Sequence, residues 1–331
     1  MTEDRKKDMV MGCLVGLAVG DAYGTTYEFK NRNSIPNEET LPNSIVGGGP
    51  FNLKPGEWTD DTSMALCLAE SLIETGWHPR DKMKRYINWW QTGYNSVTGE
   101  CFDIGGATRK ALSWFNMTQG REFIKDTDAV GNGVLMRLAA IPLMLHGEIN
   151  AVLATCAEES MHTHPSPQSV ECSMIMGAII DKILSGERDK SKILNFNNLL
   201  SDETKNYYSQ ICLKYCGGHK NGKIEEIKMM MYAGATSDKI SGNGYCVSTL
   251  ESALWAFLST DDFKSGLKKV VALGDDTDST AAVYGQIAGA YYGLSQIPWT
   301  KDIAWSEKIH NLAENLYQQN KERRNGLDKN Q

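Results

Sequence analysis

The chain has 331 residues, of which 41% are hydrophobic and 23% charged, a composition typical of a globular protein that buries a large core without disulfide bonds. The formal net charge of -7 and the dispersed lysines and arginines exclude the usual electrostatic footprint of a nucleic-acid-binding protein. No stretch of the sequence reaches the roughly 18 consecutive apolar residues of a membrane span. We therefore expect neither nucleic acid nor a membrane as a partner.

The N-terminal region begins with charged residues of both signs and continues into an apolar stretch over 9–20. A signal peptide has a basic start and an apolar core of similar length. Here Glu3, Asp4 and Asp8 lie among the basic residues, and Asp21 follows the apolar stretch at once. We expect a buried helix rather than a signal peptide.

A repeat of small residues marks two predicted helices. Glycine recurs every four residues over 12–24, and alanine and glycine recur in the same way over 281–293. A glycine costs about 1 kcal/mol relative to alanine in a helix interior, so a stripe of small residues indicates that another backbone approaches that face closely. We expect these two helices to be central in the fold.

Apolar residues at helical spacing predict further helices over 62–75, 151–159, 170–184 and 248–258. Alternation typical of strands is scarce. Residues 31–56 contain prolines and three consecutive glycines, and we expect a long loop there. The pattern as a whole predicts an all-α fold.

We expect a single domain over residues 1–319. Within it, residues 185–229 are polar, rich in lysine and asparagine, and lack helical periodicity in their first half. This segment is interpreted as a peripheral insertion. Residues 320–331 are predicted to form a polar tail.

The eight cysteines are spread along the chain and lie mostly in apolar runs, which indicates reduced, buried thiols and favours a cytoplasmic protein. Cys212, Cys216 and His219 have a spacing that would suit half of a zinc site. No second pair of cysteines or histidines lies nearby in the sequence to complete four ligands. Spectator thiols are therefore the favoured interpretation.

Two acidic segments precede or open predicted helices, residues 59–62 (TDDT) and 275–278 (DDTD). One Asp or Thr is enough to cap a helix, whereas adjacent carboxylates repel one another unless a cation or water compensates them. Carboxylate and hydroxyl oxygens together select Mg²⁺, Mn²⁺ or Ca²⁺ over zinc. The glycine and glutamate that an EF-hand loop requires do not follow Asp276 at the right positions. Metal binding is favoured over double capping, and both stay open.

Glycine-rich turns and a pair of histidines offer weaker signals. Residues 131–133 (GNG) come before an apolar predicted helix that carries Arg137, and residues 103–108 form a similar turn with one acid. A turn at a helix N-terminus offers free N–H groups to phosphate. His162 and His164 lie in a predicted loop bounded by prolines, where they either contact substrate or are ordinary surface histidines.

Taken together, these motifs resemble the ADP-ribosylglycohydrolase family, and the pattern is nearest to its bacterial dinitrogenase-reductase-activating type. The matches run in family order from Gly12 to about Gly293. The TDDT and DTD blocks are specific by themselves, and the others only jointly. The matching segments are residues 16–22 with Glu28, 47–51, 56–64, 103–105, 131–133 with 136–137, 163–164, 244–245 with 249–251, 276–279 and 289–293.

The resemblance implies a compact, orthogonal bundle of helices, two Mg²⁺ or Mn²⁺ ions, and removal of ADP-ribose from a protein side chain, typically arginine. It therefore implies an ADP-ribosylated protein as substrate, with a cognate ADP-ribosyltransferase as a further candidate partner. By motif position, the metal ligands would be Thr59, Asp60, Asp61, Asp276, Asp278 and Ser279.

The same resemblance implies roles for two further acids and for the glycine turns. Asp103 matches the acid proposed for catalysis in the bacterial type, and Glu28 matches the acid used by the serine-directed relatives. The phosphates and riboses of ADP-ribose would be held by Gly105, Gly131, Asn132, Gly133, His164 and Tyr245.

The unmatched segment 185–229 and two departures from the family pattern motivate an alternative function, that of a binding protein. Asp275 stands where the family has glycine, which adds a charge near the predicted metals, and Val134 replaces a small residue after the GNG turn. One alternative is an immunity-like protein that binds and sequesters an ADP-ribosyltransferase toxin. Others are a hydrolase of ADP-ribosyl-serine or O-acetyl-ADP-ribose, and a metal-dependent phosphoesterase.

Overall fold

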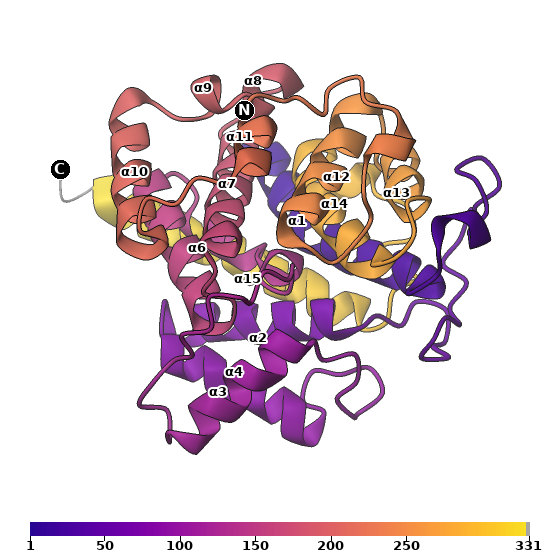
Figure 1. Cartoon of the computed structure of the whole chain (residues 1–331), viewed down its shortest axis with the longest axis horizontal. Coiled ribbons are helices and arrows are strands. Elements are labelled where there is room, and N and C mark those ends of the chain that lie inside the picture. Colours follow the sequence, from indigo (N-terminus) through magenta and orange to yellow (C-terminus); the bar gives the residue numbers. More distant parts are fainter. Residues whose placement is uncertain (329–331) are drawn as a thin grey trace.

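The computed structural model describes residues 1–328, which contain fifteen α-helices and no strand, so the predicted all-α class is confirmed (Figure 1). Short 3₁₀ helices cover Thr25–Tyr27, Arg32–Ser34, Leu135–Arg137, Ser237–Lys239 and Leu294–Gln296. The α-helices are α1 (Glu3–Gly24), α2 (Asp60–Thr75), α3 (Pro79–Thr92), α4 (Gly106–Met117), α5 (Ala140–Leu145), α6 (Ile149–Thr163), α7 (Pro167–Leu184), α8 (Lys190–Leu194), α9 (Phe196–Leu199), α10 (Asp202–Cys216), α11 (Gly222–Lys228), α12 (Cys246–Ser259), α13 (Phe263–Val271), α14 (Thr277–Tyr292) and α15 (Ser306–Asp328).

Helices α1 and α14 pack directly against each other through their stripes of small residues. A Cβ atom added at Gly16 would lie 2.3 Å from the carbonyl oxygen of Gly285, and one added at Gly20 would lie 2.2 Å from that of Ala281. At such distances only the hydrogen atom of a glycine fits between the helices, so the two backbones are in direct contact. The expectation that these two helices are central is confirmed.

The N-terminal helix is also the one described helix that is long and apolar enough to cross a membrane by length and composition. In the structure 89% of that apolar window, within Glu3–Tyr27, is buried inside the protein. Its apolar surface is covered by other parts of the same chain, chiefly α14 and α15. This is the burial expected of a core helix.

The remaining helices surround this central pair (Figure 1). Helices α12 and α13 pack against α14, α15 packs against α1, and α6 and α7 pack against each other on another side. Helix α2 pairs with α3 and also contacts α1 and α15. The N-termini of α2 and α14 thereby meet, as the contacts between their first residues described below show.

The helices predicted from apolar spacing are all present, as α2, α6, α7 and α12, and residues 31–56 form the expected loop apart from one 3₁₀ turn. Two local predictions were wrong. His162 and Thr163 are not in a loop but form the last turn of α6, with His164 at its C-cap. The GNG turn leads into the 3₁₀ helix Leu135–Arg137 rather than directly into an α-helix.

Residues 185–229 form α8 to α11 on the outside of α6, α7 and α12. They contribute buried side chains, among them Ile193, Leu199 and Tyr208, so the segment belongs to the core packing. Its status as an insertion stays a prediction. The expected boundary at residue 320 does not coincide with the end of a helix, because α15 continues to Asp328. The buried Asn320 side chain donates hydrogen bonds to the carbonyls of Met144 and His146, at the end of α5. Residues 329–331 of the predicted tail lie outside the described residues.

Candidate active site

Helix α2 is capped by an acid from another helix. The carboxylate of Asp21, near the end of α1, accepts hydrogen bonds from the backbone N–H of Thr59 at 2.9 Å and of Thr62 at 3.0 Å. It also accepts the Thr62 hydroxyl at 2.6 Å. Thr59, at the N-cap position, makes no side-chain capping bond of its own. Asp60 and Asp61 are therefore not needed to cap this helix.

Helix α14 is capped in the same indirect way. One carboxylate oxygen of Glu28 accepts hydrogen bonds from the backbone N–H of Thr277 at 2.8 Å and of Asp278 at 3.3 Å. Asp276 occupies the N-cap position and makes no side-chain capping bond. Asp21 and Glu28 thus bind the first N–H groups of both helices, and of the acidic segments only Asp278 bonds a first-turn N–H, that of Ser279 at 2.8 Å. Capping therefore does not explain why each segment carries several acids.

The two acidic segments meet. The Thr59 hydroxyl lies 3.3 Å from a carboxylate oxygen of Asp278, and the Ser279 hydroxyl lies 3.3 Å from one of Asp61. Asp276 is held by Asn132, whose amide donates to its carboxylate at 3.0 Å. Segments more than 200 residues apart in the sequence thus form one site.

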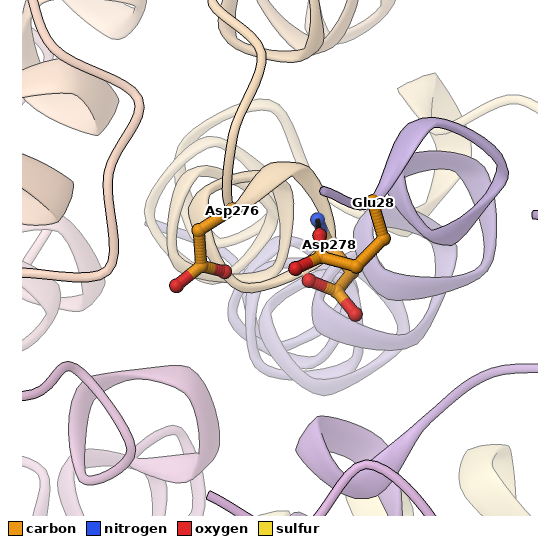
Figure 2. A group of neighbouring side chains, drawn as sticks. All are labelled: Glu28, Asp276 and Asp278. Carbon is orange, nitrogen blue, oxygen red and sulfur yellow. Dashed lines mark hydrogen bonds between the residues drawn. The ribbon is translucent and has the colours of Figure 1, made fainter. Parts of the chain in front are cut away.

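Glu28, Asp276 and Asp278 point their carboxylates into a common space (Figure 2). One ligand oxygen from each lies within 4.8 Å of the others, and among the described residues no other three acidic, His or Cys side chains lie this close together. The sequence interpretation had placed Glu28 among the catalytic residues, and the structure places it also within reach of a metal.

A buried oxygen of Asp61 gives a direct test of whether a cation fits. Asp61 is only 1% exposed. Its second carboxylate oxygen, Oδ2, is buried and has no hydrogen-bond partner. An unpartnered buried carboxylate oxygen is costly. A hard divalent cation bound by oxygen ligands would satisfy it, so the donor set fits a metal of the Mg²⁺ class.

Burial dominates the electrostatics of the acids. It raises the pKa of Asp21 to about 6, that of Glu28 to about 7 and that of Asp103 to about 8. For Asp103 the charge of Glu28 adds to the effect of burial. The pKa values of Asp61 and Asp278 are raised well above the ordinary range for the same reason, reinforced by their acidic neighbours.

These shifts predict how the stability of the metal-free protein depends on pH. Above the ordinary pKa of 3.8 for aspartate, the unfolded chain releases protons that the folded acids still hold, up to a folded pKa of about 8 for Asp103. The unfolded state therefore binds fewer protons, and stability falls as the pH rises through this interval. We expect thermal melting in the presence of a chelator to show a lower Tm near pH 8 than near pH 5. Added Mg²⁺ or Mn²⁺ should recover the loss at the higher pH, because a ligand of the native state stabilises it. A metal-free Tm that rises over this range would contradict the prediction.

Five of the acids, Glu28, Asp60, Asp103, Asp276 and Asp278, line a cavity of about 360 Å³ together with two glycine turns, 105–106 and 131–133. A more open hollow of about 810 Å³ lies next to it along α4 and shares Gly106, but it contains none of the clustered acids. Most of the residues that the sequence nominated therefore gather around one cavity. They are Glu28, Asp60, Asp103, Gly105, Gly131, Asn132, Gly133, His164, Asp276, Asp278 and Ser279.

Three nominated residues do not line this cavity. Thr59 and Asp61 lie beneath it, in contact with Asp278 and Ser279. Tyr245 pairs with Gly131 through its backbone, but its hydroxyl accepts a hydrogen bond from Asn221 at 3.2 Å. A substrate-binding role for the Tyr245 side chain stays a prediction.

Neither of the two departures from the family pattern lines the cavity. Asp275 is exposed, and its backbone N–H and carbonyl pair with Lys30 and Phe29. Its added charge was expected near the metals, but the side chain does not line the cavity. Val134 is fully buried in the core below the GNG turn.

The sequence interpretation assigned no role to Asp21. Its signal was present, because an aspartate that directly follows an apolar helical run is buried with that helix, and a buried acid is rarely without a function or partner. Arg137 and Glu159 were also unassigned, and both are fully buried. Nothing in their local sequence indicates that they meet.

Comparison with known proteins shows to which family the chain belongs. The family model described as ADP-ribosylglycohydrolase matches residues 2–326. The chain belongs to the ADP-ribosylglycohydrolase family. It is therefore a hydrolase, as the intact acidic segments also indicate.

Individual ADP-ribosylglycohydrolases agree over nearly the whole chain. The ADP-ribosylarginine hydrolase Tri1 of Serratia proteamaculans is 38% identical over 95% of this chain and 80% of its own length. The ADP-ribosyl-dinitrogen-reductase glycohydrolase of Rhodospirillum rubrum is 28% identical over 93% of this chain and 92% of its own. A solved structure described as an ADP-ribosylglycohydrolase-related protein complex superposes with a TM-score of 0.79 at 33% identity, covering 96% of this chain and 99% of that one.

Proposed function

We propose that this ADP-ribosylglycohydrolase hydrolyses the N-glycosidic bond between ADP-ribose and an arginine side chain of a protein, using two Mg²⁺ or Mn²⁺ ions. The observation that carries the proposal is the meeting of the two acidic segments beside the GNG turn in one cavity. The names of the relatives in Serratia proteamaculans and Pseudomonas putida, both ADP-ribosylarginine hydrolases, support the arginine linkage.

The proposed metal ligands are those that the family resemblance implies, with Glu28 as a further candidate because of its place beside Asp276 and Asp278. They are Thr59, Asp60, Asp61, Asp276, Asp278 and Ser279. Bound divalent ions would polarise the ribose hydroxyls and lower the pKa of a water molecule. The unpartnered oxygen of Asp61 supports their presence.

The chain itself supplies orientation and proton transfer. Cleavage of the glycosidic bond develops positive charge at the anomeric carbon, C1″, and the surrounding carboxylates stabilise that charge electrostatically. A water molecule that attacks this carbon must lose a proton, which a nearby carboxylate can accept. Gly105, the turn 131–133 and His164, which line the same cavity, would hold the phosphates and riboses.

Asp103 is the better candidate for the base than Glu28. Glu28 is engaged as the cap of α14 through the N–H of Thr277. Asp103 lies in the loop before α4, in the left-handed backbone conformation with φ 58°, and caps no helix. Its carboxylate lines the cavity and interacts there with the other acids, among them Glu28 and Asp278.

We expect Asp103→Asn to lower kcat by roughly 10² to 10⁴, the usual contribution of general acid–base catalysis. Its metal-free Tm should be at least as high as that of the wild type, because the variant removes a carboxylate that burial and the charge of Glu28 disfavour, and the rise in Tm on adding Mn²⁺ should persist. Glu28→Gln is the matched variant, and it should lower the Tm because it weakens the cap on α14. Initial rates and melting curves with and without Mn²⁺ distinguish the two. Normal kcat in Asp103→Asn would reject the assignment of the base.

The proposal as a whole is tested by release of free ADP-ribose from an arginine-modified protein, measured with each metal. Serine-modified protein and O-acetyl-ADP-ribose serve as comparison substrates, since the family contains enzymes for other linkages. Faster turnover of either would assign that linkage in place of arginine. Release of phosphate from ADP-ribose would indicate a phosphoesterase. No turnover of any substrate, with a stable complex with an ADP-ribosyltransferase, would indicate a binding protein.

We further propose a cytoplasmic location, which the eight free cysteines support, because thiols persist in reducing compartments. An ADP-ribosyltransferase must act before this enzyme, since only such a reaction creates the modified arginine.

A further inference from the structure

A chain of hydrogen bonds runs through the core to the wall of the cavity. The Arg137 guanidinium donates to a carboxylate oxygen of Glu159 at 3.1 Å and to the hydroxyl of Thr163 at 2.7 Å. The Thr163 hydroxyl in turn lies 2.9 Å from Nδ1 of His164. Arg137, Glu159 and Thr163 are fully buried, and His164 is 3% exposed. These groups are therefore shielded from bulk solvent.

The directions of these hydrogen bonds follow from the groups involved. A guanidinium only donates, so the Thr163 oxygen accepts from Arg137. A hydroxyl has a single hydrogen, and the remaining partner of this oxygen is Nδ1 of His164. If Nδ1 carried a proton, the buried hydroxyl hydrogen would have no acceptor, which costs about 1–3 kcal/mol. Thr163 therefore donates to Nδ1, and the ring proton resides on Nε2.

The Nε2 edge of the ring faces the GNG turn. Ideal Cβ positions at Gly131 and Gly133 would lie 3.6 and 3.0 Å from Nε2, so this edge packs on the two glycines at the cavity wall. Among the described residues no side chain or backbone group hydrogen-bonds to Nε2, whereas Nδ1 is occupied. Burial, followed by the charge of Arg137, lowers the pKa of His164 to about 3, so the ring stays neutral.

We propose that Thr163, oriented by Arg137, is a positioning residue that holds His164 in its neutral Nε2–H tautomer, so that the ring donates one hydrogen bond to an anionic oxygen of the ligand. The other neutral tautomer would present a lone pair to that oxygen and repel it. The identity of the ligand, the diphosphate of ADP-ribose, rests on the proposed function. The tautomer itself does not.

The tautomer can be measured without ligand or turnover. Long-range ¹H–¹⁵N correlation spectra of ¹⁵N-histidine-labelled protein separate the two tautomers from each other and from the imidazolium. We expect His164 to show the Nε2–H pattern, unchanged between about pH 5 and 8, the interval in which an ordinary histidine titrates. His162 is an internal reference, because its Nδ1 contacts Lys82 at 2.8 Å rather than Thr163. An Nδ1–H or charged His164 overturns the proposal.

Variants at Thr163 test the positioning role. Thr163→Val should lose the pure Nε2–H pattern at His164 but leave the His162 signals in place. Its Kd for ADP-ribose, measured by calorimetry, should rise about tenfold, the equivalent of one hydrogen bond, and KM should change more than kcat. Thr163→Ser keeps the hydroxyl and should restore both properties. Thr155→Val, on the same helix and also buried, is the matched control and should resemble the wild type.

Each failure points to a different error. An unchanged tautomer in Thr163→Val overturns the role of Thr163, and unchanged affinity overturns the role of His164 as donor. If Thr163→Val does not fold, the wild-type spectrum and Thr163→Ser still decide the tautomer. If the wild type shows the Nε2–H tautomer but does not bind ADP-ribose, the proposed function fails and the tautomer assignment stands.

Discussion

Replacing Asp278 with alanine should abolish metal-dependent turnover while leaving the metal-free protein at least as stable as the wild type. Asp278 is 2% exposed and lies beside Glu28 and the Thr59 hydroxyl. Its carboxylate accepts one hydrogen bond from the N–H of Ser279 at 2.8 Å, whereas the N–H groups of Thr277 and Asp278 that begin α14 are bonded to Glu28. The pKa of Asp278 is raised by burial and by the charges of Glu28 and Asp61. Removing it relieves this repulsion but removes a proposed ligand.

The matched control is an aspartate that acts only as a cap. Asp262 accepts a hydrogen bond from the backbone N–H of Ser265 at 2.8 Å at the start of α13. Asp262→Ala should lower the free energy of unfolding by about 1 kcal/mol and leave turnover intact. The two variants should thus show opposite patterns of activity and stability.

Three measurements check this prediction: ADP-ribose release, the Tm in chelator, and the rise in Tm with Mg²⁺. Asp278→Ala should lose turnover and most of the metal-induced rise. Asp61→Ala should behave in the same way, and the double variant should be no worse than either, because ligands of one site act as a unit. Near-normal turnover in Asp278→Ala would show that the acidic segments do not bind the catalytic metals.

The second large effect concerns the packing of the two central helices. Gly285→Ala should lower the free energy of unfolding by at least about 3 kcal/mol, at or above the upper end of the usual cost of overpacking. A Cβ atom at this position would lie 2.0 Å from the carbonyl oxygen and 2.6 Å from the carbonyl carbon of Gly16. Both are backbone atoms of a buried helix, so a side-chain rotation cannot relieve the clash.

A glycine with free space around it provides the control. Gly222 begins α11 and an added Cβ would meet nothing within 4 Å. Gly222→Ala should change stability by less than about 1 kcal/mol, with a small gain expected from reduced freedom of the unfolded chain. Urea unfolding of both variants, followed by circular dichroism, gives the comparison. A Gly285→Ala protein as stable as the wild type would mean that α1 and α14 can separate at little cost.

The two predictions are connected through the site. Helix α1 carries Asp21 and is followed by Glu28, and α14 carries Asp278 in its first turn. The close contact at Gly16 and Gly285 sets the distance between these helices. A partly folded Gly285→Ala protein should therefore lose metal binding as well as stability.

The sequence by itself was enough to predict the central helix pair and the acidic segments. A glycine every four residues places small residues on one face of a helix, and this periodicity is local. Asp60 and Asp278 lie in the first turns of predicted helices, a position in which acidic side chains are favourable and which can be recognised from the local sequence. The resemblance in motif order added which of these residues share a site, and the comparisons confirmed the family.

Only the tertiary structure decided how the acids are used. Glu28 caps a helix whose first N–H lies 249 residues further along the chain, and Asp21 caps α2 across 38 residues. Because Asp21 and Glu28 bind the N–H groups that begin α2 and α14, these groups do not depend on Asp61 and Asp278, the ligands proposed above for a cation. The same holds for Arg137, which reaches Thr163 and hence His164 through the core. Such contacts depend on how helices pack, and local spacing carries no information about the direction in which a side chain meets a distant partner.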